Sequence, residues 1–267
     1  MRAYISVFKL RFILLLQYRA AAFAGLCTQF AFGAMHIMVM MAYYKAVGSA
    51  MPMTLQQTIS YIWLTQAFLG IVALWTRDGE IMELIRSGNI AYELTRPLDI
   101  YNYWYCRGIA MRTAPTLLRC IPLFSVVFLL PRGFGLMLPF SLPYGLLFVL
   151  SLLLAILLVS AISNLTYMLT MLSVSGDGII LIMAVLGELL SGMLIPLPLM
   201  PDWIQGVINI LPFRGILDTP FRIYLGNIPP SAILPSLLHQ AIWIVLLVVL
   251  GKLIFSPMRR RVTLQGG

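Results

Sequence analysis

Charge is scarce in this chain of 267 residues, since 10% of it is Asp, Glu, Lys or Arg while 61% is hydrophobic. The mean hydropathy is +0.94. A water-soluble protein of this length could not cover so much apolar surface, so the composition excludes an ordinary soluble domain. It indicates an integral membrane protein.

Motifs for nucleotide and metal chemistry are missing. The sequence has no G-x-x-x-x-G-K-[ST] loop to hold ATP phosphates, and it has neither H-E-x-x-H nor G-x-S-x-G. These absences exclude a P-loop motor on this chain and argue against a metalloprotease or a serine hydrolase. The paired-aspartate clusters of metal-dependent lipid transferases are missing too. We therefore expect a protein that is not an enzyme and carries no cofactor of its own.

Cysteine and histidine are rare. Cys27, Cys106 and Cys120 are odd in number and lie in or beside apolar segments, so they predict no disulfide framework. His36 and His239 stand alone on distant apolar segments, where packed neutral histidines are commoner than metal ligands, and we expect no metal. The net charge is +9, but the basic residues are dispersed rather than clustered on one face, so we expect no nucleic-acid partner.

Long apolar runs dominate what is present. Six of them approach the ~20 residues that a bilayer-spanning helix needs. They cover about 20–44, 57–76, 113–130, 144–172, 178–195 and 232–255. We predict an all-α polytopic membrane protein with six transmembrane helices. No linker or repeat divides the chain, so 1–267 is expected to be a single transmembrane domain.

The basic residues predict the orientation of these spans. With both termini in the cytoplasm, most Lys and Arg residues lie on the cytoplasmic side, as the positive-inside rule requires. Arg119 falls inside the third predicted span. The residues left on the outer side are Lys45, Arg132, Arg214 and Arg222.

Residues 1–19 mix four basic residues with apolar side chains. This pattern predicts a helix that lies at the cytoplasmic surface of the membrane. A signal peptide is the alternative, because AAAFA follows. Its apolar core would be short, however, and Arg19 would adjoin the cleavage site.

The predicted cytoplasmic connection 77–112 holds five of the nine acidic residues, beside five arginines. Its first part, 79–85, is expected to be helical and to end near Gly88. A short mixed-charge helix at the membrane face suits docking onto another protein. The alternative is a solvated loop whose charges keep it out of lipid. The candidate docking residues are Glu80, Glu83, Arg86, Gly88, Glu93 and Arg96.

Polar residues inside the spans are the candidates for a translocation pathway. An ionisable group at membrane depth usually faces protein or water, so Glu188 either lines the pathway or has a structural role, such as pairing with Arg214 or Arg222. The small polar residues of the fourth span indicate close helix packing or a polar wall, and both readings stay open. The candidate pathway residues are Glu188, Asn164, Tyr167 and Met193.

Prolines break the chain repeatedly at 196–231. Proline lacks an amide hydrogen and clashes with the preceding turn, so a straight spanning helix cannot pass through this stretch. It is too apolar for an aqueous loop. We predict re-entrant or interfacial short helices that close the external end of the bundle, one of them opening at Asp202. The candidate gate residues are Pro196, Pro201, Trp203, Pro212 and Arg214.

Four segments of this stretch carry a family resemblance. In chain order they are 192–197 (G-x-x-x-P-L), 200–204 (P-x-W), 211–214 (L-P-F-R) and 224–226 (Y-L-G), and a further match lies at 94–98. Together they resemble the ABC-2 type transporter permeases. The closest resemblance is to a bacterial branch in which paired permeases work beside a separate ATPase.

The resemblance implies a permease subunit of an ABC exporter in the bacterial cytoplasmic (inner) membrane. It implies that 77–112 is a coupling loop that docks on ABC ATPase subunits. A second permease chain, identical or homologous, would supply the other half of the conduit, surrounded by membrane lipids. ATP and Mg would be bound by the partner ATPase.

Other functions stay open at this point. An importer, or a membrane-assembly or immunity subunit of the same architecture, would have the same helices. An integral membrane enzyme would need polar catalytic groups converging at one depth, and Glu188 with scattered hydroxyls is all that the spans offer. A passive channel would need rings of charge or a filter sequence, and neither occurs.

Overall fold

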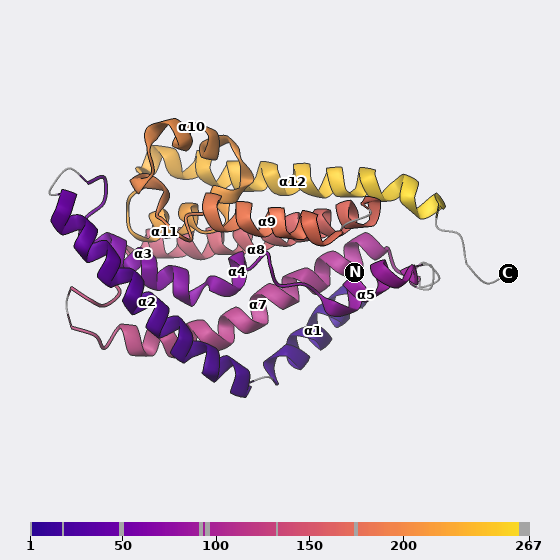
Figure 1. Cartoon of the computed structure of the whole chain (residues 1–267), viewed down its shortest axis with the longest axis horizontal. Helices are drawn as coiled ribbons and strands as arrows, with labels where there is room; N and C mark the ends of the chain where they lie inside the picture. The colour runs from indigo at the N-terminus through magenta and orange to yellow at the C-terminus, as the bar shows by residue number, and fades with distance from the viewer. Residues whose placement is uncertain are drawn as a thin grey trace.

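Helix α8 (Leu142–Leu172) runs through the middle of the bundle (Figure 1). It packs against α7 (Ile100–Val127), α9 (Gly176–Leu190), α11 (Asp218–Tyr224) and α12 (Pro230–Arg261). Its apolar run is almost uninterrupted, so several of its faces can be buried at once. The core of the protein therefore forms around this helix.

The computed structural model describes residues 2–17, 19–47, 51–90, 93, 97–131, 133–173 and 176–261. All regular elements in these ranges are helical, which agrees with the predicted all-α class. Arg96 and Arg132 lie outside the described residues, as does most of the 94–98 match.

Three helices are long and apolar enough to cross a membrane. Their crossing stretches are Ala24–Val47 in α2 (Arg19–Val47), the whole of α8, and Pro230–Pro257 in α12. They correspond to the predicted first, fourth and sixth spans. Within the described ranges the other helices are too short or too polar by the same measure. The second, third and fifth predicted spans therefore need correction.

The second predicted span, 57–76, is not a continuous helix. Helix α3 (Leu55–Ala67) ends at Phe68, and α4 (Leu69–Val72) is a single turn. Gly70 approaches α7 closely here, since a Cβ at Gly70 would lie 2.6 Å from the hydroxyl oxygen of Thr116. An apolar run with one glycine does not reveal such a break, so the single helix expected over 57–76 is in fact two helices.

The third predicted span began at 113, whereas α7 begins at Ile100. Asp99 caps it by accepting a hydrogen bond from the amide of Asn102 at 2.9 Å. The predicted boundary followed from Arg107 and Arg112, whose charges argue against burial. Both are nevertheless buried in α7, at 2% and 4% exposure, because each has polar partners elsewhere in the chain. The connection before α7 is therefore shorter than 77–112.

The fifth predicted span, 178–195, is shortened to α9. The chain turns after it at Gly192, whose φ is +87°. Glycine is required here for two reasons. Residues with a side chain rarely adopt this φ, and a Cβ would collide with the hydroxyl of Tyr61. The apolar residues beyond Leu190 thus belong to a turn rather than to the helix.

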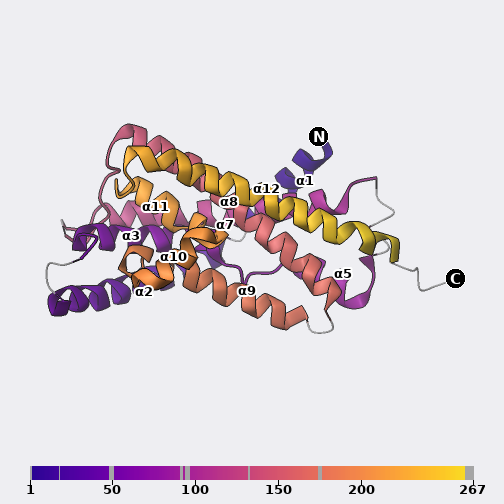
Figure 2. The same ribbon diagram turned by 90° about the horizontal axis from the view of Figure 1, so that it is seen from above.

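Helix α1 (Arg2–Leu16) packs along α7. Helix α5 (Gly79–Ser87) lies near the start of α7 (Figure 1). The C-terminal part of α12 reaches the same end of the molecule (Figures 1 and 2). We call this the α5 end. The helical character of the N-terminal segment is confirmed, while its position at a membrane surface stays a prediction.

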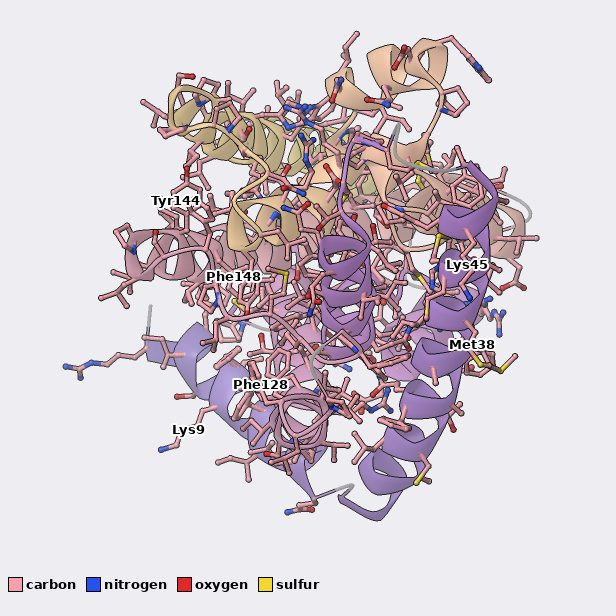
Figure 3. The ribbon with its side chains drawn as sticks, turned by 90° about the vertical axis from the view of Figure 1, so that its left-hand side faces the viewer. Lys9, Met38, Lys45, Phe128, Tyr144 and Phe148 are labelled. Carbon is pink, nitrogen blue, oxygen red and sulfur yellow. The ribbon has the colours of Figure 1, made fainter. Side chains whose placement is uncertain are left out.

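The opposite end, which we call the α11 end, holds the proline-broken stretch. It folds into η1 (Leu197–Leu199), α10 (Asp202–Ile210), η2 (Pro212–Gly215) and α11. Helix α11 packs against α8 and α3 inside the bundle, whereas α10 lies on the outside (Figure 1). Short helices in this stretch were predicted, and the structure confirms them. Viewed from this end, α2 lies at the side with Met38 pointing away from the bundle (Figure 3).

Candidate functional site

Helix α5 begins and ends with clear local signals. The Asp78 carboxylate caps it by accepting hydrogen bonds from the amides of Glu80 and Ile81, at 3.1 and 3.3 Å. At the other end Gly88 has a φ of +72°, the left-handed conformation that ends many helices. The predicted helix after Gly79 and its break at Gly88 are both confirmed.

The two faces of α5 differ. Ile81 and Met82 are buried in an apolar cluster with Trp104 of α7 and Met168 of α8. Glu83 points to the exposed side, as do the residues that end the helix. The helix is therefore fixed to the bundle by its apolar face and presents a polar face outward.

A buried ion pair holds the start of α5 to α7. Arg107 donates hydrogen bonds from Nε and Nη2 to the Asp78 carboxylate, at 2.8 and 2.6 Å. The two side chains are 2% and 8% exposed. Tyr167 of α8 adds a third anchor, because its hydroxyl accepts a hydrogen bond from the Asp78 amide at 2.9 Å. Two fork-like hydrogen bonds of this kind fix both distance and orientation.

Glu80 extends this pair to α1. Its carboxylate accepts two hydrogen bonds from the Arg11 guanidinium, one of them at 2.7 Å, and one from Arg107 at 2.9 Å. The hydrogen bond from Arg11, together with the charge of Arg107, lowers the pKa of Glu80 to about 2. We call Arg11, Asp78, Glu80 and Arg107 the α5 cluster.

A second set of ion pairs ties α5 to α9. Asp177, in the first turn of α9, accepts hydrogen bonds from Arg77 at 2.6 Å and from Arg86 at 2.9 Å. Arg77 lies just before α5, and Arg86 lies in its last turn. These side chains are largely exposed, so each pair contributes only ~0–1 kcal/mol. Their main effect is to fix the position of α5, because they connect it to α9 in addition to α1, α7 and α8.

Arg112 lies one turn deeper in α7. Its guanidinium donates to the carbonyl oxygen of Ala73 and, at 3.0 Å, to the hydroxyl of Ser163 in α8. A buried cation is costly unless it has such partners. Here it fastens the chain that leads from α4 to α5.

A cavity of about 540 Å³ opens beside the α5 cluster. Its lining includes Arg11, Glu80, Glu83 and Arg107, so charges of both signs surround it. Glu93, another candidate docking residue, also lines it and is 6% exposed. The cavity therefore lies on the outward side of α5, where a partner could insert polar groups.

Four of the candidate docking residues thus divide into two groups. Glu80 and Arg86 form ion pairs within the chain, so their charges already have partners. Glu83 and Gly88 are exposed, and a Cβ at Gly88 would meet nothing within 4 Å. The exposed group is the one that is free to contact another protein.

Two candidate pathway residues lie between helices of the same chain. Asn164 is 2% exposed and donates a hydrogen bond to the backbone carbonyl of Tyr101 at 3.1 Å. Tyr167 is bound to the Asp78 amide as described. Both positions agree with the helix-packing reading of the fourth span. Their part in transport stays a prediction.

The other two candidates lie near the end of α9. Glu188 is half-buried, and among the described residues it forms no ion pair with Arg214 or Arg222. Arg222 binds Asp218 instead, at 3.5 Å, and Arg214 binds Asn209, at 2.7 Å. Pairing with these arginines, one of the roles that the sequence left open for Glu188, is therefore not found among the described residues. Met193 packs against the core and lines a separate cavity beside α2.

The candidate gate residues shape the α11 end. Pro196 and Pro201 precede η1 and α10, and Pro212 lies in the first turn of η2. Trp203 is 76% exposed on α10, on the same side as the exposed Ile210. Such an apolar face with a tryptophan is typical of a helix at a membrane interface.

The sequence reasoning missed the ion pairs that organise the α5 end. In the sequence, Asp78 and Arg107 are two charges among the ten of the 77–112 connection, and no pattern singles out Asp177. One signal was available: Asp78 directly precedes Gly79 and Glu80, an arrangement typical of a capped helix start. Nothing local indicates that Arg107 is its partner.

The whole chain was compared with known protein families, curated proteins and solved structures. No curated protein and no solved structure matches it. Residues 23–266 match the protein family described as ABC-2 family transporter protein. This match covers most of the chain, including α5 and the α11 end, but not α1. The chain therefore belongs to the ABC-2 family of transporter proteins.

Proposed function

We propose that this chain is the permease subunit of an ATP-driven ABC exporter and forms half of its translocation pathway. The observation that carries the proposal is the α5 end, where one short helix is joined by buried contacts and ion pairs to α1, α7, α8 and α9. The exporter direction rests on the resemblance of the 192–226 segments. No group on this chain is needed for ATP hydrolysis.

In this proposal the chain crosses the membrane six times. Besides α2, α8 and α12, the crossings use α3 with α4, α7, and α9 with the turn after it. Shorter or broken helices are tolerated at membrane depth where protein surrounds them. The α5 end then faces the cytoplasm, together with both termini, and the α11 end faces outward. The host membrane is a bacterial cytoplasmic membrane.

The proposed coupling step relies on the rigid attachment of α5 to α7 and α1. ABC ATPase subunits, holding ATP and Mg, dock on the exposed side of α5 around Glu83. When they close, α5 is displaced. Because Asp78 and Glu80 hold Arg107 and Arg11, the displacement passes directly to α7 and α1. A second permease chain, identical or homologous, supplies the facing half, and the path opens between the two.

The test is co-purification with candidate ABC ATPases, followed by ATPase and transport assays in liposomes. The most useful variant is Glu83→Arg combined with Ser87→Arg, since both side chains are exposed and neither takes part in the ion pairs between helices. We expect it to lower ATPase binding at least about tenfold, equivalent to ~1.4 kcal/mol. Reversing Glu80 or Arg86 would be less clear, because it also breaks contacts within the chain.

Lys45→Glu is the matched control, because Lys45 is exposed in the last turn of α2, and this end of α2 lies at the opposite end of the molecule from α5 (Figure 1). It should bind ATPase like the wild type. If the double variant bound and coupled normally, α5 would not be the docking element. If no ATPase co-purified with the wild-type chain, the exporter assignment itself would fail.

A further inference from the structure

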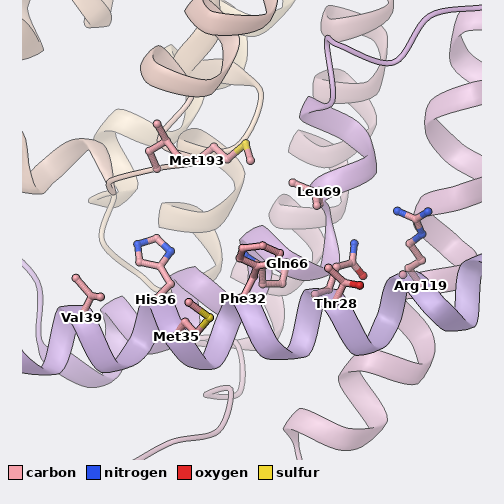
Figure 4. A pocket seen from close by; sticks show the side chains of 12 residues that line it. Thr28, Phe32, Met35, His36, Val39, Gln66, Leu69, Arg119 and Met193 are labelled. Carbon is pink, nitrogen blue, oxygen red and sulfur yellow. The ribbon is translucent and has the colours of Figure 1, made fainter.

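A second cavity lies away from the α5 end, between α2 and the core of the bundle (Figure 4). Its volume is about 610 Å³, within the range of small-molecule sites. Helix α2 forms one wall, and α3, α4, α7 and the turn after α9 form the others. Nothing in the proposed coupling step uses it. We call it the α2 cavity.

Two polar side chains in the α2 cavity lack partners among the described residues. Gln29 is 3% exposed, and neither its Oε1 nor its Nε2 forms a hydrogen bond. Arg119 forms no ion pair, and its buried Nε has no hydrogen-bond partner. Buried amides and intramembrane cations are normally satisfied, so each unpaired group points to something that binds there.

The two groups are close to one another along the cavity. Arg119 lies against α2, since a Cβ at Gly25 would be 3.2 Å from the arginine Cζ. Gln29 follows Gly25 by one helical turn, so both face the same side of α2. No acidic side chain lines the α2 cavity among the described residues. The unpaired charge is therefore positive, with an amide beside it.

Thr28, His36 and Gln66 also line the cavity, and the other lining residues are apolar or glycine. Phe32, Met35 and Val39 line it and are 60%, 59% and 62% exposed (Figure 4). They continue along α2 from the polar end. Methionine adapts its shape to varied ligands, so this wall suits a flexible chain. The cavity thus has a cationic end and a mainly apolar wall that reaches the exposed side of α2.

We propose that the α2 cavity binds an amphiphile with one acidic headgroup and an apolar chain. The carboxylate or phosphate of the headgroup accepts hydrogen bonds from Arg119 and from the Gln29 amide, as charge-assisted pairs of this kind favour. The chain lies along Phe32 and Met35. The site goes beyond coupling to ATP, because it needs only the permease chain. The ligand is either a lipid of the bilayer or a cargo of the transporter.

The experiment uses the full chain purified in a non-ionic detergent at about pH 8, where fatty carboxylates in solution are ionised. Radiolabelled oleate is the first probe, with methyl oleate as the uncharged probe of equal chain length. We expect oleate to bind with one site per chain and at least about tenfold more tightly than the ester. Arg119→Gln should remove this preference, and Gln29→Leu should weaken oleate binding several-fold.

Two further variants separate binding from folding. Thr28 is exposed and lines the cavity, so Thr28→Trp should block the entrance while leaving every charge in place. Lys9→Gln removes one exposed positive charge outside the cavity and should change nothing. If Arg119→Gln fails to fold, the ester comparison and Thr28→Trp still decide the question.

A second pair of probes, phosphatidylglycerol and phosphatidylcholine, distinguishes a bilayer lipid from a cargo as the source of the ligand. Retention of phosphatidylglycerol alone, lost in Thr28→Trp, assigns the site to an acidic bilayer lipid. Oleate binding without phosphatidylglycerol binding assigns it to a single-chain acidic cargo. Equal binding of oleate and its ester, or unchanged oleate binding in Thr28→Trp, would overturn the proposal.

Discussion

The buried pair between Asp78 and Arg107 gives the sharpest prediction on stability. Removing one partner of a buried ion pair costs ~3–5 kcal/mol, because the other charge is left without compensation. In Asp78→Ala, Arg107 keeps its hydrogen bond to Glu80, whose side chain is 61% exposed, so the lower end applies to the pair. Loss of the helix cap adds ~1 kcal/mol. We expect a total near ~3–4 kcal/mol.

The unfolding free energy of the purified chain in mixed micelles measures this effect. Asp78→Asn should cost less than Asp78→Ala, because the amide oxygen still accepts the cap hydrogen bonds. The double variant Asp78→Leu with Arg107→Met should cost less than the sum of its single variants, since it leaves no buried charge unpaired. Glu83→Ala, on the exposed side of α5, is the control and should cost less than ~0.5 kcal/mol.

Two results would mean that the pair is not buried in the folded protein. One is that Asp78→Ala destabilises the chain no more than Glu83→Ala. The other is that the effects of the two single variants add up to that of the double variant.

Three further predictions concern other positions. Gly192→Ala should lower the thermal midpoint more than Gly88→Ala, since both have positive φ but only the first has Tyr61 in the way; equal shifts would contradict this. Gln240→Leu should cost ~1–3 kcal/mol in chemical unfolding, because it removes hydrogen bonds from a fully buried amide to two backbone carbonyls, and a neutral result would count against the packing of α12. The pKa of Glu80 is lowered from 4.5 to about 2, so its stabilisation is present above about pH 4.5 and is lost as pH falls toward about 2. The thermal midpoint of Glu80→Gln should therefore depend less on pH in this window than that of the wild type, by a small amount because the side chain is mostly exposed.

The sequence predicts the long helices well. The cores of α2, α8 and α12 are apolar over more than the thickness of a bilayer, and no tertiary contact is needed to identify them. The short α5 and α10 were also predictable, because a cap residue or proline begins each and a glycine or proline follows each. These are local signals.

The helices that depend on distant contacts were predicted less well. The start of α7 was placed too late, because the burial of Arg107 depends on Asp78, a residue in another element. The break at Phe68 and the close approach of Gly70 to Thr116 beside it are features that hydropathy does not encode. A local pattern cannot show that a charge is compensated by a residue far away in the chain.

The candidate site was predictable in outline only. The docking helix and its exposed Glu83 follow from the sequence. The partner of Glu80 does not, because Arg11 is 69 residues away. The unpaired groups of the α2 cavity, Gln29 and Arg119, could not be recognised as neighbours before the bundle was known.

The central claim is that an ATPase docks on the exposed side of α5. A photo-activated crosslinker placed at position 83 tests it most directly, with the same crosslinker at position 45 near the other end of the molecule as the control. In membranes that contain this chain and its ATPase, we expect a crosslink to the ATPase from position 83 and none from position 45. A crosslink from position 45 without one from position 83 would contradict the account.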